Sequence, residues 1–276
     1  MNTLQELRKE KGTLVVAHRG SSAGNIPCNT MAAFDVAIRD GADMIEMDLF
    51  RNVDGDIFIF HTGKEPSHID RHVNIESLTT KEILNLKRCN SDLIETSIGI
   101  ERFEDVLEHL KDRVYLNLDR AVQLMDWVIP IVERMGMKNQ ILLKSDPSEK
   151  SLKIIEEFAP DYAYMPIFME NPENWELIKN MNINCVGAEL VFATEDSILA
   201  SDSYLEGMHE EGMLLWGNSL VYNSKIPLAA GHNDDKSVVG DPDGGWGWLV
   251  KKGFDLIQTD WAGHCVRYLE EKGFRK

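Results

Sequence analysis

Eight short apolar runs, most of them followed by a helical pattern, predict that this 276-residue chain folds as a (β/α)₈ TIM barrel of the α/β class. Alternation of strand and helix is typical of a parallel sheet, and eight such units close the sheet into a barrel. No internal repeat, low-complexity tract or Pro/Gly-rich linker divides the sequence. We therefore expect a single barrel domain over residues 1–276.

The expected elements can be placed by residue number. We expect strands at 14–17, 43–49, 114–119, 140–144, 161–165, 183–189, 213–216 and 255–259. We expect helices at 29–39, 122–135, 147–158, 172–180, 196–210, 245–251 and 261–270. Only the connection after the second strand departs from simple alternation.

About 60 residues separate the second and third expected strands, where a barrel normally places one helix. The segment contains an extended run at 56–60 that ends in His61, and two helical patterns. Thr79 followed by Glu82 forms a capping box that opens the first helix, and residues 101–110 form the second. We interpret the stretch at about 62–111 as an insertion into the barrel.

Composition and charge restrict the possible partners. The chain is 43% hydrophobic with a formal net charge of -17, so its surface repels nucleic acid and anionic lipid. No run of about 18 apolar residues is present, and residues 1–12 do not resemble a signal peptide. We expect a cytoplasmic protein without a membrane span, whose four widely spaced cysteines are reduced thiols.

Acidic side chains gather where the second and third strands end. Side chains alternate along a strand, so Glu46 and Asp48 share one face of the second strand, and Asp119 ends the matching face of the third. Active sites of barrels form at this carboxyl end, the mouth. The acids could pair with Arg19 and Lys144 or lie in water. Three converging carboxylates instead favour one divalent cation, Mg²⁺ or Ca²⁺, which prefers oxygen ligands.

The same mouth should collect further polar and aromatic residues. By the same alternation, the strand ends place His18, Arg19, Lys144, Glu189 and Trp216 there. His61 follows the extended run after the second strand. Two histidines beside a predicted metal site suit general acid–base catalysis, because their pKa lies near working pH.

Five motifs follow one another along the chain: A-H-R-G at 17–20, P-C-N-T-M-A-A-F at 27–34, G-A-D-M-I-E-M-D at 41–48, D-G at 54–55 with His61, and G-F-D-L-I-Q-T-D at 253–260. Together they resemble the glycerophosphodiester phosphodiesterase family, within the phosphatidylinositol-phospholipase-C-like superfamily. The resemblance is dense over residues 14–61 and continues in order through the rest of the chain.

The resemblance implies a role for each matching residue. His18 and His61 would be the acid–base pair, and Glu46, Asp48 and Asp119 would hold the cation. The phosphodiester substrate would be bound by Arg19, Lys144, Glu189 and Trp216. The implied reaction is metal-dependent hydrolysis of a glycerophosphodiester to glycerol 3-phosphate and an alcohol. Attack by water or by a neighbouring glycerol hydroxyl is left open.

Three residues depart from the family pattern. Cys28 stands where the family has Glu, Thr62 replaces the Asp after the second histidine, and Asp119 replaces a common Glu. These departures keep two alternatives open. One is phospholipase D-like cleavage of a phospholipid or lysophospholipid head group, as in sphingomyelinase D-like enzymes. The other is a non-catalytic protein that binds phosphodiesters.

Two weaker patterns have structural interpretations. His68 and His72 lie four residues apart, but no Cys or third His accompanies them, so a solvated loop or helix is expected. The acidic stretch at 232–248 is interpreted as a long loop on the face of the active site. The leaving alcohol, the choice between Mg²⁺ and Ca²⁺, and the oligomeric state are left open.

Overall fold

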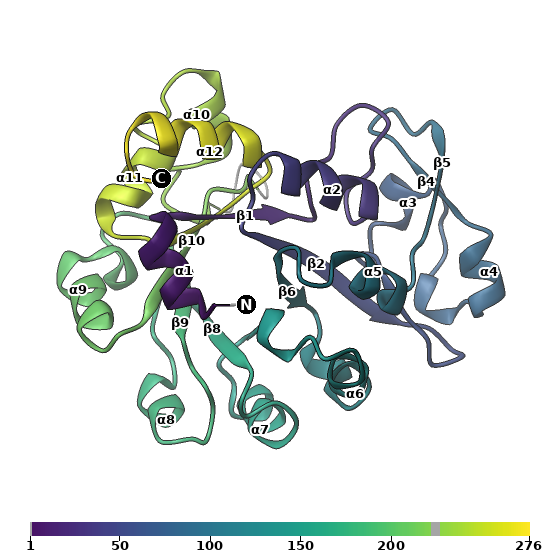
Figure 1. Cartoon of the computed structure of the whole chain (residues 1–276), viewed down its shortest axis with the longest axis horizontal. Coiled ribbons are helices and arrows are strands. Elements are labelled where there is room, and N and C mark those ends of the chain that lie inside the picture. Colours follow the sequence, from purple (N-terminus) through teal and green to yellow (C-terminus); the bar gives the residue numbers. More distant parts are fainter. Residues whose placement is uncertain (1, 222–226) are drawn as a thin grey trace.

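The computed structural model describes residues 2–221 and 227–276 and forms a closed eight-stranded parallel barrel (Figure 1). Its strands are β1 (Leu14–His18), β2 (Met44–Arg51), β6 (Tyr115–Asp119), β7 (Ile141–Ser145), β8 (Ala163–Met169), β9 (Gly187–Val191), β10 (Leu214–Asn218) and β11 (Leu256–Thr259). The order β1-β11-β10-β9-β8-β7-β6-β2 is closed by pairing of β2 with β1. The predicted TIM barrel is confirmed.

Helices follow the strands and surround the barrel, as expected, except that the helix at residues 103–110 had been assigned to the insertion. They are α2 (Met31–Arg39), α5 (Phe103–Leu110), α6 (Met125–Met135), α7 (Glu149–Phe158), α8 (Trp175–Lys179), α9 (Asp202–Glu210), α11 (Trp246–Lys252) and α12 (Ala262–Glu271). Short 3₁₀ turns at Ile75–Ser77, Val122–Leu124, Lys138–Gln140 and Ile198–Ala200 complete the connections. One core lies between helices and sheet. A smaller one, which includes Val16, Met44 and Trp216, fills the barrel interior.

Between β2 and α5 lies the insertion (Figure 1). It consists of β3 (Ile57–Ile59), α3 (Glu65–His68), α4 (Thr80–Leu84) and the hairpin β4 (Lys87–Cys89) with β5 (Glu95–Gly99). The predicted capping box of α4 is present. Strand β3 pairs antiparallel with the end of β2, and a separate cluster of Phe and Ile side chains fills the space beside it. The barrel sheet therefore continues directly into the insertion.

Three of the described helices, the short α3 among them, were not expected from the sequence. Helix α1 (Leu4–Lys11) precedes β1 and is opened by a capping box of Thr3 and Glu6. Helix α10 (Asp234–Val239) lies in the stretch interpreted as a loop, so that interpretation is wrong for these six residues. The side chain of Asn233 accepts a hydrogen bond from the backbone N–H of Lys236 and stabilises the start of α10.

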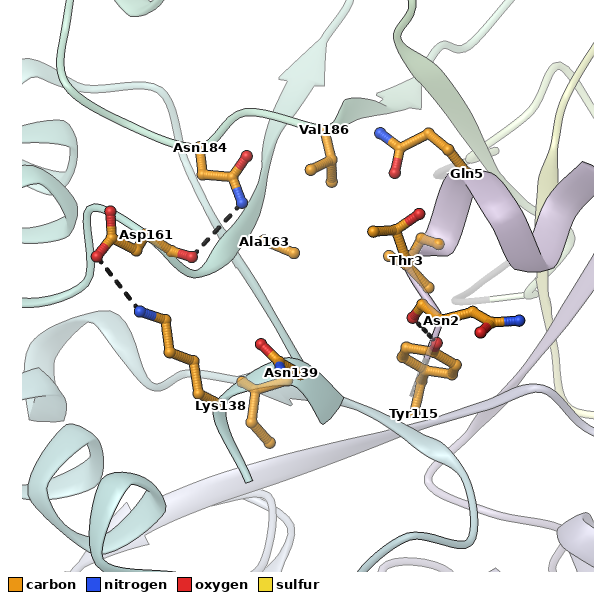
Figure 2. Close-up of a pocket in the computed structure, with 12 residues that line it drawn as sticks. Asn2, Thr3, Gln5, Tyr115, Lys138, Asn139, Asp161, Ala163, Asn184 and Val186 are labelled. Carbon is orange, nitrogen blue, oxygen red and sulfur yellow. Dashed lines mark hydrogen bonds and ion pairs between the residues drawn. The ribbon is translucent and has the colours of Figure 1, made fainter. Parts of the chain in front are cut away.

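The amino ends of the strands form the opposite face of the barrel, the bottom. A cavity of about 310 Å³ lies there between the segment at residues 2–5 and the loops that precede the strands (Figure 2). The Tyr115 hydroxyl donates to the Asn2 carbonyl, and Lys138 pairs with Asp161 at 3.3 Å. Over the residues described, no helix has the length and apolar character needed to cross a membrane.

Candidate active site

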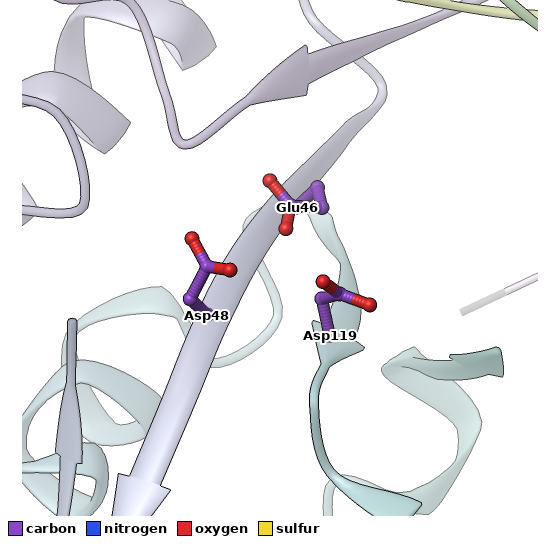
Figure 3. A group of neighbouring side chains, drawn as sticks. All are labelled: Glu46, Asp48 and Asp119. Carbon is purple, nitrogen blue, oxygen red and sulfur yellow. The ribbon is translucent and has the colours of Figure 1, made fainter. Parts of the chain in front are cut away.

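The predicted acids converge at the mouth because β2 and β6 pair in register there. In the pairing of β2 with β6, Glu46 lies opposite Asn117 and Asp48 opposite Asp119. One carboxylate oxygen from each of Glu46, Asp48 and Asp119 lies within 4.8 Å of the other two (Figure 3). The three carboxylates point toward a common space between the two strands.

The hydrogen bonds of these acids leave oxygen atoms free for a cation. Asn29 donates from Nδ2 to Asp48 Oδ2 at 2.7 Å and accepts from the Asp48 backbone N–H at 3.2 Å. Arg19 Nε lies 2.8 Å from the same Oδ2, as an ion pair whose N–H is not directed at the oxygen. Asp48 Oδ1 is buried and has no hydrogen-bond partner within the described residues. A buried carboxylate oxygen without a donor fits a hard cation.

The raised pKa values of two of these acids also indicate that the site lacks a compensating cation. Burial and the neighbouring charge of Asp48 raise the pKa of Glu46 from its usual 4.5 to about 8. Burial likewise raises the pKa of Asp119. Carboxylates this close cannot all ionise without compensation, and a divalent cation in their midst would restore the anionic forms.

His18 is held by an aspartate from the far end of the sequence. Its Nδ1 lies 2.8 Å from Asp260 Oδ1, and its Nε2 lies 4.0 Å from Glu46 Oε2. Burial lowers the pKa of His18, but the hydrogen bond to Asp260 and the charge of Glu46 outweigh burial and raise it. Asp260 closes the motif at 253–260, which was the available signal, but sequence analysis gave it no role.

His61 has cationic neighbours. Its Nε2 lies 3.9 Å from Asp48 Oδ1, and its Nδ1 contacts the Thr62 carbonyl at 2.8 Å. The Arg120 guanidinium lies 3.4–3.5 Å from both ring nitrogens and donates to Thr62 Oγ1 at 2.8 Å. Burial, with the charges of Arg19 and Arg120, lowers the pKa of His61. Sequence analysis missed Arg120, which directly follows β6. Its backbone is left-handed, so the alternation of side chains along the strand does not predict where its side chain points.

Of the remaining residues predicted to bind substrate, Lys144 and Glu189 form an ion pair, and the Trp216 ring packs against Lys144. Lys144 Nζ donates to Glu189 Oε2 at 2.6 Å, and Asn218 Nδ2 donates to Glu189 Oε1 at 2.6 Å. Both Lys144 and Glu189 line the cavity at the mouth. Trp216 is 0% exposed and does not line it. Its ring lies 3.9 Å from Lys144 Nζ, so the structure places Trp216 below the mouth as a cation–π support for Lys144.

The mouth cavity has a volume of about 310 Å³ and is lined by both ionisable and apolar residues. The ionisable residues that line it are His18, Arg19, Glu46, His61, Asp119, Lys144 and Glu189. Its apolar residues are Ile167, Met169, Val191, Leu220 and Leu228, which we call the apolar wall. Asn218 and Gln258 complete the described lining. Sequence analysis did not predict the apolar wall.

Cys28, which stands in place of the family Glu, lines a separate cavity of about 410 Å³ together with His68 and Cys89. Next to it, the fully buried Arg88 donates from Nη2 to the carbonyls of Asn29 and Ile59, at 2.9 and 3.0 Å. Burial lowers the pKa of His68 to about 4. His68 lies at the end of α3, with its ring centroid 5.9 Å from that of Phe60, so it is partly buried rather than fully solvated.

Comparison with known proteins places the chain in a family. The family model for the glycerophosphoryl diester phosphodiesterase family matches residues 18–216, well over half of the sequence. The chain belongs to this family. A second model, described only as a domain of unknown function, matches residues 164–269. The match to the family includes both histidines, the three acids and the Lys144–Glu189 pair.

Individual relatives agree with this placement. A glycerophosphodiester phosphodiesterase of Bacillus altitudinis is 36% identical over 106 residues, which are 37% of this chain and 41% of that protein. The chain spans less than two thirds of the length of the curated relatives that it matches. A glycerophosphoryl diester phosphodiesterase of Parabacteroides distasonis shares the fold, with TM-score 0.79, 15% identity, and coverage of 99% and 93% of the two chains.

A phosphodiesterase of Oleispira antarctica has the same fold, with TM-score 0.70 and 15% identity over 98% of this chain and 100% of its own. That structure is a complex with the product sn-glycerol-3-phosphate. At this identity the likeness concerns the fold alone.

Proposed function

We propose that this protein hydrolyses a glycerophosphodiester to glycerol 3-phosphate and an alcohol, using one divalent cation and two histidines. The observation that carries the proposal is the group of three buried carboxylates with oxygens within 4.8 Å of one another, flanked by His18 and His61. Family membership and the product complex of the Oleispira antarctica protein support the same reaction class.

Binding of the phosphodiester would be electrostatic. The Arg19 guanidinium lies beside the acids at the edge of the cavity, where it can donate to a phosphoryl oxygen. Lys144 keeps an ammonium group at the cavity while Glu189 and the Trp216 ring fix its position. Arg120 adds a third cationic group close to His61. These residues would orient the phosphorus between the two histidines.

The two histidines would move the protons. One accepts a proton from the attacking hydroxyl as it bonds to phosphorus, and the other donates a proton to the alcohol oxygen as the P–O bond breaks. Asp260 acts as a positioning residue, because its bond to Nδ1 of His18 directs Nε2 toward the acids. His61 Nδ1 is oriented in the same way by the Thr62 carbonyl.

Glu46, Asp48 and Asp119 would hold the cation. When bound, it neutralises charge that develops on the phosphoryl oxygens. The buried Asp48 Oδ1 without a donor and the raised pKa of Glu46 support this placement. Asp119 reaches less far than the Glu common in the family, so the metal preference of this site is open to measurement.

The proposal is tested by release of glycerol 3-phosphate from glycerophosphocholine, glycerophosphoethanolamine and glycerophosphoglycerol, with Mg²⁺, Ca²⁺ or EDTA. We expect release that requires one of the two cations and stops with EDTA. Release of glycerol 3-phosphate at the same rate in EDTA would refute the requirement for a divalent cation. No release from any diester by folded protein in the presence of either cation would refute the activity.

A further inference from the structure

We propose that Asp234 is a positioning residue for the reaction, which fixes the backbone at Asp260 and, through the Asp260 carboxylate, the ring of His18. The inference rests on the proposed function and extends its machinery by one buried carboxylate. Asp234 is the first residue of α10 and is 2% exposed. It does not line the cavity at the mouth, so it would act on the substrate only through other residues.

The side chain of Asp234 accepts four hydrogen bonds. Three side chains donate to Oδ1, which are Ser219 Oγ at 2.6 Å, Trp246 Nε1 at 2.7 Å and Thr259 Oγ1 at 2.7 Å. The backbone N–H of Asp260 donates to Oδ2 at 2.8 Å. These donors lie at or directly after the carboxyl ends of β10 and β11, and at the start of α11. One carboxylate therefore ties two neighbouring strand ends together at the mouth.

The charge of Asp234 suits this role. Burial raises the pKa of Asp234 to about 6, although its four hydrogen bonds act in the opposite direction. Above this value the group is ionised, so both oxygens are acceptors and neither carries a proton. Hydrogen bonds to an ionised acceptor are shorter and stronger than those between neutral groups. The bond to the Asp260 N–H is thus a strong one in a buried place.

The backbone at Asp260 matters because its side chain holds His18. Asp260 Oδ1 lies 2.8 Å from His18 Nδ1, while the other ring nitrogen faces Glu46. The Asp260 side chain is 51% exposed, so burial alone does not fix its direction. A fixed backbone limits the positions that this exposed carboxylate can reach. Misplacement of a reacting group by 1 Å can lower a rate by roughly a hundredfold, so a support of this kind should influence turnover.

The role of Asp234 is argued from the geometry of this chain and not from family membership. The family match ends at residue 216, before Asp234 and before all four residues that donate to it. The second model, which has no known function, covers all five residues.

Asp234→Asn is the decisive substitution, because it keeps the size of the side chain. Its amide oxygen can still accept from the three donors that now bond to Oδ1. Its NH₂ group then faces the Asp260 N–H, where two donors repel each other. We expect kcat of the metal-loaded full chain on a glycerophosphodiester to fall by about fivefold or more, with a smaller change in KM.

Asp255→Asn is the matched control. Asp255 is a buried carboxylate at the other end of β11, and it also accepts a backbone N–H, from Leu215 at 2.9 Å. Both substitutions should lower the melting temperature, because each weakens a buried hydrogen-bond network. Only Asp234→Asn should lower kcat. An equal effect of the two variants on kcat would overturn the inference.

A double-mutant cycle tests the route through Asp260. Asp260→Ala keeps the backbone N–H but removes the carboxylate that contacts His18. If Asp234 acts through that carboxylate, Asp234→Asn should lower kcat no further in the Asp260→Ala protein. A further fall as large as that caused by Asp234→Asn alone would overturn the inference.

Thermal unfolding shows whether each variant is folded. Asp234→Ser is the second variant if Asp234→Asn does not fold, because its shorter side chain does not reach the Asp260 N–H either, and the same results are expected. Wild-type kcat in the folded Asp234 variant overturns the inference and leaves the proposed function intact. Absence of hydrolysis by the folded wild type with either cation overturns the proposed function and the inference together.

Discussion

Buried acids lie at both ends of strand β2, and they differ in how many hydrogen-bond donors their carboxylate oxygens have. Asp43, just before the strand, lies at the bottom of the barrel, and Glu46 and Asp48 lie toward the mouth. Both Asp43 oxygens are saturated: Oδ1 accepts from Lys11 at 2.8 Å and from Arg275 at 3.0 Å, and Oδ2 accepts from Arg275 and the Val15 N–H. At the mouth, Asp48 Oδ1 has no donor among the described residues.

Strand β11 shows the same contrast. Asp255, at the bottom, accepts from Arg8 at 2.8 Å and from the Leu215 N–H at 2.9 Å, and contacts His209 at 3.0 Å. Asp260, at the mouth, is half exposed and contacts His18. Carboxylates at the bottom are therefore fully paired and stabilise the closed barrel. At the mouth, Glu189 is also paired at both oxygens, but Asp48 keeps an oxygen without a donor among the described residues. Ligands and catalysis are expected at this face of the barrel.

The largest effect on stability should follow from removing the buried ion pair of Asp43 at the bottom of the barrel. Asp43→Ala leaves Arg275 buried without its carboxylate, so the free energy of unfolding should fall by about 3–5 kcal/mol. Lys11→Ala is the control: its side chain is 40% exposed, and we expect a loss below about 1 kcal/mol. Denaturant unfolding measures both. A loss for Asp43→Ala no larger than that for Lys11→Ala would show that the bottom acids do not differ in this way.

Substitution of the two histidines at the mouth should lower activity rather than stability. His18→Ala and His61→Ala should each lower kcat/KM for a glycerophosphodiester by about a hundredfold or more, because proton transfer is lost. His209→Ala removes the His–Asp contact at the bottom and should leave kcat/KM close to wild type. Retention of near wild-type turnover by either mouth variant would contradict the acid–base roles.

A smaller effect is expected at the residue that positions His18. Asp260→Asn keeps the size of the side chain but removes the charge next to Nδ1. We expect a fall in kcat/KM of about tenfold, and a shift of the pH profile toward lower pH on the limb that reports His18. An unchanged pH profile would mean that Asp260 has only a structural role.

The smallest effect concerns pH and stability in EDTA. The pKa of Glu46 is about 8 in the folded metal-free protein and 4.5 in the unfolded chain. The folded state then binds the extra proton between these values, so stability should fall as pH rises from about 4.5 to 8. Glu46→Gln should remove this component. Parallel curves of melting temperature against pH for wild type and Glu46→Gln would contradict the assignment.

Much of this arrangement could be predicted from the sequence. Alternation of apolar and polar residues located all eight barrel strands. It also placed Glu46, Asp48 and Asp119 on the same face of two neighbouring strands. The end of the first predicted strand placed His18 and Arg19 at the same mouth, where both line the cavity. These predictions succeeded because side-chain direction along a strand has a fixed period of two.

Two misses share one physical cause, the position of strand ends. Strand β10 runs to Asn218 rather than residue 216, so Trp216 lies one layer below the mouth. Strand β8 runs to Met169 rather than residue 165, so the sequence placed none of the apolar wall at the cavity. Pairing with neighbouring strands extends both strands, and a local pattern does not contain that information.

Other features depend on contacts between distant segments. Arg120 reaches His61 across 59 residues, and Asp260 reaches His18 across 242. Helix α10 was missed because it is short and acidic and depends on its cap at Asn233. No periodic signal in the sequence reports these contacts, which form only when the barrel closes.

The most direct test of the account is metal binding followed by thermal unfolding. Melting temperatures are measured with increasing Mg²⁺ or Ca²⁺ for wild type, Glu46→Gln and Asp43→Ala. A ligand that binds only the folded state raises the melting temperature. We predict a rise for wild type and for Asp43→Ala, and little or none for Glu46→Gln. An equal rise in Glu46→Gln would contradict the assignment of the acids at the mouth to a metal.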